Sequence, residues 1–390
     1  MKLFKRLLVA PAALGLLAPL SANASEVNLN EVSNYSTTSE FEMNSTTFVN
    51  PSSVSTLLAG GEGMADDHDH DGGFSETTTA SFSVDFATGY EDGTDAKDSL
   101  GAYYGFQIDL NTSFTGEDSL DISLDAGNAG NQVTELDLNS TTSEALTVDG
   151  VSYTFPVMGA TVIVGDGVDG SSLFSTACVY GGPSNNLDDC GNGSSAIGGG
   201  AGTALGASYE FDNGVAVAVG YTGSGSTTAG LATKESNDSV AAQVTYTADS
   251  YGVSFTGANV EASNNDGYNY YALNGYWTPS DSGAIPSISV GYEKGTGQKK
   301  TDTRQWFTGL QWDEAGPGTF GIAIGTVGAS ENGPNTADPQ HTSPELLMYE
   351  AFYSYEVNDG MTVTPLIYSK ETKAGTDDLT GVMVKTSFSF

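Results

Sequence analysis

Apolar and polar residues alternate along most of this sequence, and this period of two constrains the fold more than any other feature. In the last stretch, LTGVMVKTSFSF, one parity is apolar and ends on Phe390, while the other carries Lys385 and two serines. The same alternation recurs in segments of about ten residues, such as ASFSVDF (80–86) and SLDISLD (119–125). This period is typical of β-strands with one apolar and one polar face.

An exposed strand edge next to so much apolar surface would aggregate unless the sheet closed on itself. Segments of about ten residues, when tilted, are long enough to cross a hydrocarbon layer of roughly 30 Å. We therefore predict an all-β fold, a transmembrane antiparallel β-barrel of about 16 strands over residues 74–390. Carboxylates on the polar parity would then line a water-filled lumen. The candidates for this pore lining are Asp85, Asp109, Asp121, Asp125 and Glu350.

The connections between the segments alternate in length, which is a second sign of a barrel. Seven short turns, such as MG at 158–159, are rich in steps that favour tight hairpins. Eight longer loops fall between them, and the longest spans residues 168–201. These connections predict 16 strands, an even number with both ends on the same side of a membrane. Aromatic residues in 267–277, 303–313 and 346–356 are candidates for girdles at the two membrane surfaces.

The first 73 residues differ in character from the rest of the chain. Residues 1–24 combine a basic start, an apolar stretch and an Ala-Asn-Ala site, which predicts a signal peptide for export. Residues 25–73 are polar and acidic without sustained periodicity, so we predict an acidic, largely disordered tail. His68 and His70 lie among aspartates in this tail and are the candidates for a metal site. We favour a solvated linker there, because a disordered segment supplies no fixed ligand geometry.

The charge balance restricts the partners of this protein. The chain has 12 basic and 49 acidic residues and a formal net charge of −37. Nucleic acid is excluded as a partner, because binding phosphates requires clustered lysine and arginine. The sequence contains no Ser-His-Asp constellation, phosphate-binding loop or EF-hand, so we predict neither an enzyme nor a bound cofactor. A secreted, acidic, Ca²⁺-stabilised β-sandwich or solenoid adhesin would share this composition and is the alternative.

Both cysteines of the chain, Cys178 and Cys190, lie in the longest loop. An exported chain meets an oxidising compartment, so we predict a disulfide between them. Two unpaired thiols are the alternative.

Several stretches of ten or more residues resemble one known family. They include FQIDLNTSFTGEDSLDISLDAGNAGN, GYWTPSDSGAIPSISVGYE, YEVNDGMTVTPLIYSKE and GVMVKTSFSF. These stretches resemble the Som-type outer-membrane porins of marine cyanobacteria, and the likeness covers the signal and residues 74–390. The resemblance implies a 16-stranded, homotrimeric diffusion porin of the cell outer membrane, distantly similar to carbohydrate-selective porins. Larger members carry an S-layer-homology domain before the barrel, so this chain resembles a short form in which residues 25–73 take that place.

On this basis we expect passive diffusion of small hydrophilic solutes through a barrel set in outer-membrane lipids. We expect the barrel-assembly machinery to read Phe390. The loop 168–201 is expected to fold inward and narrow the pore, stiffened by the disulfide. A surface lid without a role in conductance is the alternative for this loop.

Charge at this constriction predicts the selectivity of the pore. The loop would bring negative charge to the narrow zone through Asp166, Asp169, Asp188 and Asp189. Pores that favour anions need rings of arginine or lysine. Because the chain has few basic residues, we expect a preference for cations and neutral solutes. Salt screening should keep this preference mild.

Overall fold

The computed structural model describes the barrel region in detail, with gaps in its longer connections. The described residues are 77–93, 100–129, 135–136, 138, 144–188, 190–191, 200–225, 230–233, 236–261, 267–280, 284–297, 302–327, 330–331, 345–372 and 377–390. The expected signal peptide (1–24), the acidic tail (25–73), His68 and His70 lie outside these residues. Within them, no helix has the length and apolar character needed to span a membrane.

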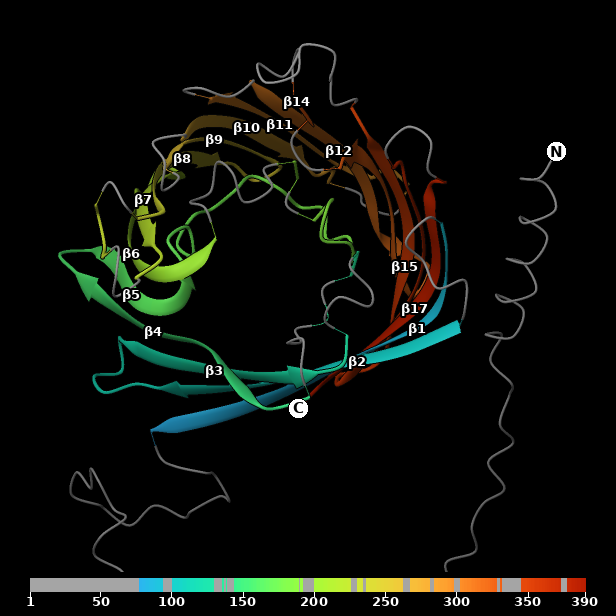
Figure 1. The fold of residues 1–390 in the computed structure, drawn as a ribbon, viewed down its shortest axis with the longest axis horizontal. Helices are drawn as coiled ribbons and strands as arrows, with labels where there is room; N and C mark the ends of the chain where they lie inside the picture. The colour runs from blue at the N-terminus through green and yellow to red at the C-terminus, as the bar shows by residue number, and fades with distance from the viewer. Residues whose placement is uncertain are drawn as a thin grey trace, which may run out of the picture. The chain divides into compact units, whose positions relative to one another are not determined.

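Sixteen strands of 9 to 15 residues form one antiparallel sheet within the described residues, and Figure 1 shows this sheet as a ring. The strands are β1 (Thr78–Asp92), β2 (Leu100–Thr112), β3 (Ser119–Gly127), β4 (Thr147–Val157), β5 (Ala160–Asp169), β6 (Ala201–Glu210), β7 (Val215–Gly223), β8 (Asp238–Thr247), β9 (Tyr251–Val260), β10 (Tyr268–Trp277), β11 (Ser287–Gly297), β12 (Thr303–Ala315), β13 (Gly318–Thr326), β15 (Leu347–Asn358), β16 (Met361–Lys370) and β17 (Leu379–Ser389). A two-residue strand, β14 (Ser330–Glu331), pairs with the start of β12.

The sheet closes because β1 pairs with β2 on one edge and with β17, the last strand, on the other. The prediction of a closed antiparallel barrel of about 16 strands is therefore confirmed. The alternative β-sandwich or solenoid is not supported, because one sheet closes on itself instead of stacking on another sheet.

Short turns and longer connections alternate around the barrel, as the sequence predicts. The turn between β4 and β5 consists of Met158 and Gly159, with φ angles of 53° and 85°. Both residues are thus in the left-handed region, as a tight two-residue hairpin requires. The connection between β5 and β6, from Gly170 to Gly200, is on the opposite end of its strands and is much longer.

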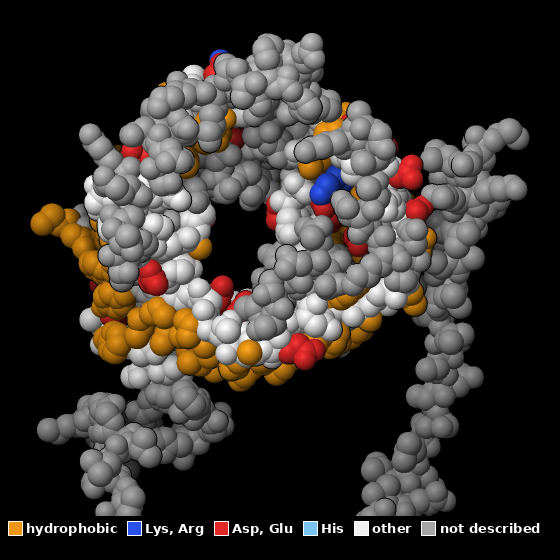
Figure 2. Space-filling view, in the orientation of Figure 1, with side chains coloured by type: hydrophobic (Ala, Val, Ile, Leu, Met, Phe, Trp, Pro, Cys, Tyr) orange, Lys and Arg blue, Asp and Glu red, His pale blue; other side chains and the backbone are white. Residues whose placement is uncertain are grey.

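The two faces of the sheet differ as the alternation predicts. On β8, Val240 and Val244 are 54% and 52% exposed, whereas the intervening Ala241 and Gln243 are buried. Large apolar side chains are exposed in the same way on most other strands, and Figure 2 shows hydrophobic side chains along the outer rim of the ring. The outer surface is therefore an apolar band, which water would not solvate favourably.

Aromatic pairs gather where the strands meet their short turns. The ring centroids of Phe82 and Phe390 lie 5.6 Å apart, and those of Tyr209 and Phe211 lie 4.8 Å apart. Further pairs at this end are Tyr153 with Phe155, Tyr246 with Tyr251, and Trp312 with Phe320. This arrangement forms one aromatic girdle at the turn end of the barrel.

A hydrophobic core lies inside the barrel, and the sequence analysis did not predict it. Strands β12, β13, β15, β16, β17 and β1 contribute inward-facing apolar side chains to this core, among them Phe307, Met348, Phe352, Leu366 and Met383. Residues of two inter-strand connections cover them. The expectation that the inner face is polar throughout is therefore wrong for this part of the wall, because the apolar residues there pack against chain and not against water.

Candidate functional site

Part of the connection between β5 and β6 lies inside the ring, along the inner wall (Figure 1). We call its described residues, 170–188 and 190–191, the inner segment. An opening remains at the centre of the ring in Figure 2, beside this segment. The inner segment and the wall opposite it are therefore the candidate functional site of the barrel.

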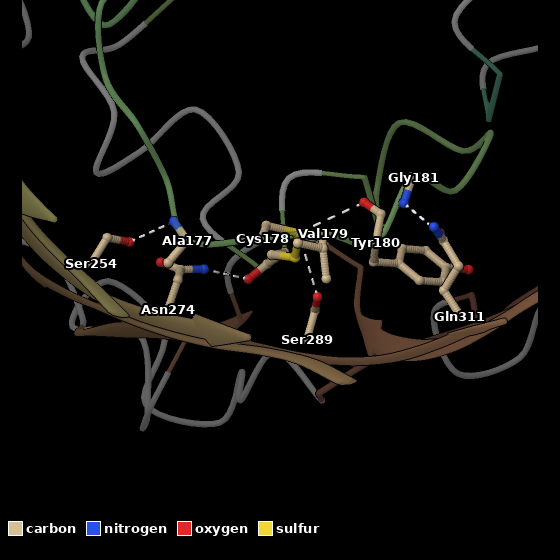
Figure 3. The surroundings of a disulfide bond; sticks show 10 residues. Ala177, Cys178, Val179, Tyr180, Gly181, Ser254, Asn274, Ser289 and Gln311 are labelled. Carbon is tan, nitrogen blue, oxygen red and sulfur yellow. Dashed lines mark hydrogen bonds between the residues drawn. A yellow bond between two sulfur atoms is a disulfide. The ribbon is translucent and has the colours of Figure 1, made fainter. Parts of the chain in front are cut away.

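The inner segment is held by a row of polar side chains from the wall (Figure 3). Alternate backbone amides of the segment donate to side chains of four wall strands. Ser175 donates to Gln243 Oε1 of β8 at 2.7 Å, and Ala177 to Ser254 Oγ of β9 at 2.9 Å. Val179 donates to Ser289 Oγ of β11 at 3.1 Å, and Gly181 to Gln311 Oε1 of β12 at 2.9 Å. The amide of Ala177 is buried and needs such an acceptor, because leaving a buried amide unpaired costs free energy. The row therefore fixes the path of the segment across the wall.

Two further hydrogen bonds complete this row. Asn274 of β10 donates from Nδ2 to the carbonyl oxygen of Cys190 at 2.8 Å. Thr245 of β8 donates from Oγ1 to the carbonyl oxygen of Ser175 at 2.7 Å. Every strand from β8 to β12 thus contributes at least one contact to the segment.

Glycines on the inner wall make room for the segment. A Cβ atom on Gly220 of β7 would lie 1.9 Å from the carbonyl oxygen of Gly170. A Cβ atom on Gly291 of β11 would lie 1.6 Å from the carbonyl oxygen of Cys190. On β12, a Cβ atom on Gly309 would lie 2.6 Å from the ring of Tyr180. Such distances are far inside van der Waals contact, so the segment lies this close to the wall only where glycine is present.

A disulfide and an aromatic anchor hold the middle of the segment. Cys178 and Cys190 are joined, which closes a loop with a sequence separation of 12. The ring of Tyr180 packs against Phe307 and Phe352, with centroid distances of 5.3 and 5.8 Å. Its hydroxyl donates to Glu350 Oε1 at 2.7 Å. Burial and the neighbouring carboxylate raise the pKa of Tyr180 well above its usual range, so the phenol stays protonated.

Three of the predicted pore-lining carboxylates lie on the inner face and take part in polar contacts there. Asp85 forms an ion pair with Lys385 at 3.3 Å. Asp109 accepts hydrogen bonds from two side chains, Gln107 at 2.7 Å and Ser123 at 2.6 Å. Asp121 likewise accepts from Asn111 Nδ2 at 2.6 Å and from Ser119 Oγ at 2.7 Å. These residues belong to β1, β2 and β3, a part of the wall that the row of hydrogen bonds does not cross.

The other two predicted pore-lining residues are buried. Asp125 accepts a hydrogen bond from Thr147 at 3.0 Å and is 8% exposed. Glu350 is 4% exposed and bonded to Tyr180 of the inner segment. Both side chains point inward, but the structure does not place them at the open passage.

The predicted constriction aspartates have different positions. Asp166 belongs to β5, pairs in register with the outward-facing Val151 and accepts a hydrogen bond from Thr203 at 2.6 Å. The expectation that Asp166 adds charge at the constriction is therefore wrong, because the residue lies on the outward-facing parity of β5, before the connection begins. Asp169 is the last residue of β5, where the connection starts, and Asp188 is exposed within the inner segment. Asp189 lies outside the described residues.

The inner face of the described strands has more acidic than basic groups. Both inward lysines are ion-paired, Lys385 with Asp85 and Lys370 with Glu135. Asp109 and Asp121, in contrast, are bonded to amide and hydroxyl groups. The described part of the chain contains no cluster of three or more His, Cys, Asp or Glu side chains arranged to hold a metal ion.

The residues that hold the inner segment were missed by the sequence analysis. Gln243, Ser254 and Ser289 are uncharged, and they sit on the polar parity like ordinary lumen residues. The signal that distinguishes this wall is the glycine on the same parity, at Gly220 and Gly291. An inward glycine removes a side chain from the lumen, and such a gap indicates that another part of the chain approaches there.

This closed barrel, with a connection folded against its inner wall, has the fold of outer-membrane porins. The solved structures that it resembles include OprB from Pseudomonas putida, with a TM-score of 0.57 and 11% identity over 80% of this chain and 94% of that chain. An anion-selective porin from Comamonas acidovorans is similar with a TM-score of 0.55 and 12% identity, over 80% of this chain and 99% of that chain. The trimer form of OmpT, an outer-membrane protein of Vibrio cholerae, is similar with a TM-score of 0.56 and 10% identity, over 81% of this chain and 100% of that chain. No family model matches the sequence, and neither does any curated protein.

Proposed function

We propose that this protein is an outer-membrane porin through which small hydrophilic solutes diffuse passively. The observation that carries the proposal is the closed barrel with apolar side chains outside, an opening at its centre and a connection fastened to its inner wall. Strands of 9 to 15 residues are long enough to cross a hydrocarbon layer when tilted. Lipid acyl chains would cover the apolar band, and the aromatic girdle would lie at one membrane surface.

The finer assignments follow from the sequence resemblance and the fold together. We propose a Som-type porin in its short form, exported with residues 1–24 as signal and with residues 25–73 as an acidic tail before a barrel at 74–390. A homotrimer is in keeping with the trimer form of the similar Vibrio cholerae protein. Phe390, which stacks on Phe82 at the closure of the barrel, is the residue that the assembly machinery would read.

We propose that the inner segment forms the constriction. Its fixed course, the disulfide and its position beside the opening support this role. Asp169, Asp188 and Asp189 would add negative charge near the narrow zone. Among the described residues, the inward lysines Lys370 and Lys385 are ion-paired, whereas Asp109 and Asp121 are bonded to amide and hydroxyl groups, so the passage should prefer cations and neutral solutes. The preference should be mild, since the Debye length is about 8 Å at physiological salt.

Reconstitution of the purified protein into liposomes tests this function. Swelling rates would be measured for neutral sugars, amino acids and inorganic salts, with protein-free liposomes and boiled protein as controls. We expect swelling that slows with solute size, including the small sugars that the resemblance to carbohydrate-selective porins suggests. A reversal potential across a salt gradient would give the sign of the charge preference. Absence of swelling with a folded, inserted barrel would contradict the proposal, and a preference for anions would contradict its charge argument.

A further inference from the structure

A second connection, the one between β3 and β4, also reaches into the barrel. Its described residues Glu135, Leu136 and Leu138 are 1%, 4% and 3% exposed. Leu136 and Leu138 belong to the same internal core as Leu366 and Met383 of the barrel wall. This short stretch therefore lies against the wall and not on the outer end of the barrel.

The stretch contacts the inner segment directly. Leu136 forms an antiparallel bridge with Ser184. The backbone amide of Asn185 donates to the carbonyl oxygen of Glu135 at 3.0 Å, and Asn186 Nδ2 donates to Glu135 Oε2 at 2.7 Å. One residue, Glu135, thus contacts the inner segment through both its backbone and its side chain.

The other oxygen of the same carboxylate binds the barrel. Lys370 of β16 forms an ion pair with Glu135 Oε1, and the lysine side chain is 23% exposed. A charge as deeply buried as Glu135 is tolerated only with a charged partner and further hydrogen bonds, because desolvation is expensive. The carboxylate is therefore bound on one side to the wall and on the other to the inner segment.

The neighbourhood makes this lysine difficult to replace. Glu91 of β1 lies close enough to interact electrostatically with both Glu135 and Lys370, and it accepts a hydrogen bond from the Tyr368 hydroxyl. Lys370 is thus the counter-charge for two carboxylates. Loss of Lys370 would therefore leave the buried carboxylate of Glu135 without its counter-charge.

We infer that Glu135 is a positioning residue that fastens both inward connections to β16 and thereby sets the size limit of the channel. This inference rests on the proposed porin function. Apolar packing of Leu136 and Leu138 would hold their own connection, but it supplies no polar link to Asn186. The carboxylate supplies that link.

The test uses the full-length protein with Glu135→Ala, and a charge swap with Glu135→Lys and Lys370→Glu. Asp302→Asn is the matched control, because its ion pair with Lys294 is long, at 3.6 Å, and exposed. Heat-dependent migration on gels reports barrel folding, single-channel recording gives the conductance, and liposome swelling with a series of sugars gives the size limit. We expect Glu135→Ala to raise the conductance by at least about twofold and admit larger sugars. The charge swap should partly restore the wild-type conductance and size limit, because the Asn186 side-chain amide can rotate so that its Oδ1 accepts a hydrogen bond from the lysine at position 135.

Folded Glu135→Ala protein with the conductance and size limit of the wild type would overturn the inference while the porin function stood. If Glu135→Ala does not fold, Asn186→Ala removes only the contact to the inner segment, and an unchanged size limit in that variant would overturn the inference instead. A wild-type protein that folds and inserts but conducts nothing would refute the porin function, and the inference with it.

Discussion

Replacing Gly291 by alanine should push the inner segment away from the wall. The added Cβ atom would lie 1.6 Å from the carbonyl oxygen of Cys190 and 2.6 Å from Nδ2 of Asn274. A carbon and an oxygen atom need about 3.3 Å, so the carbonyl must move by roughly 1.7 Å. A shift of this size would break the 2.8 Å hydrogen bond from Asn274 to that carbonyl.

The segment should move in preference to the strand. Overpacking of this kind costs about 1–3 kcal/mol. Gly291 sits in β11, which is paired along its length with β10 and β12, whereas Cys190 lies on the inner wall through side-chain packing in the internal core and one hydrogen bond from Asn274. The cheaper response is to lift the Cys190 end of the segment into the lumen and leave the barrel intact.

Single-channel recording would detect this movement as a changed unit conductance. Gly257→Ala on β9 is the matched control, because its Cβ atom would meet nothing closer than 3.7 Å. We expect the control to behave like the wild type, and Gly291→Ala to show lower conductance or frequent partial closures in a barrel of unchanged heat stability. Wild-type conductance from folded Gly291→Ala protein would refute the close approach of the segment to β11.

Three further predictions concern the turn end, the lumen charge and the disulfide. Hydrogen bonds, the first from Tyr153, hold the pKa of Asp118 well below its usual range, so this carboxylate stabilises the fold above about pH 4 and less as the pH falls further. Asp118→Asn should therefore lower the unfolding temperature at pH 7, and the gap from wild type should shrink in acid; an equal gap at both pH values would contradict this. Asp121→Asn should reduce the cation-to-anion permeability ratio by less than about twofold, measured as a reversal potential in dilute salt, and an increase would argue against a lumen position. Replacing Cys178 and Cys190 by serine removes the cross-link that closes this loop, a restraint on chain freedom worth about 3 kcal/mol. The freed segment should move more and increase the current noise of the open channel, and noise equal to that of the wild type would contradict this prediction.

Much of the barrel was predictable because the two faces of each strand have different surroundings: the outer face is an apolar surface, and the inner face is mostly polar. The alternation around Phe82, Leu120 and Val382 assigns the outward face, and short turns such as Met158–Gly159 assign the ends. A period of two needs no knowledge of distant contacts, since each strand displays it alone.

The site was less predictable because alternation does not say what an inward residue meets. Phe307, Met348 and Leu366 are apolar residues at positions of the otherwise polar, inward-facing parity. From the sequence alone, they could equally belong to a wider apolar surface on the outside of the barrel. Whether they meet water or chain depends on where two long connections fold, and those connections have no period. The polar residues from Gln243 to Gln311 do not reveal the inner segment either, because the same residue types would also suit an open, water-filled lumen.

Asp166 shows the limit of reasoning from loop boundaries. The strand β5 continues to Asp169, past a bulge in its pairing with β6. Bulges shift register by local geometry that the sequence pattern does not display. The carboxylate of Asp166 therefore accepts a hydrogen bond from Thr203 on the outward side of the sheet and does not face the lumen.

The most direct test of the account is the conductance of single channels in planar bilayers with neutral polymers of increasing size in the bath. The account predicts stepwise currents that small polymers reduce and large polymers leave unchanged, because only the small ones enter a passage beside the inner segment. Folded, inserted protein that gives no steps would contradict a water-filled passage through the barrel.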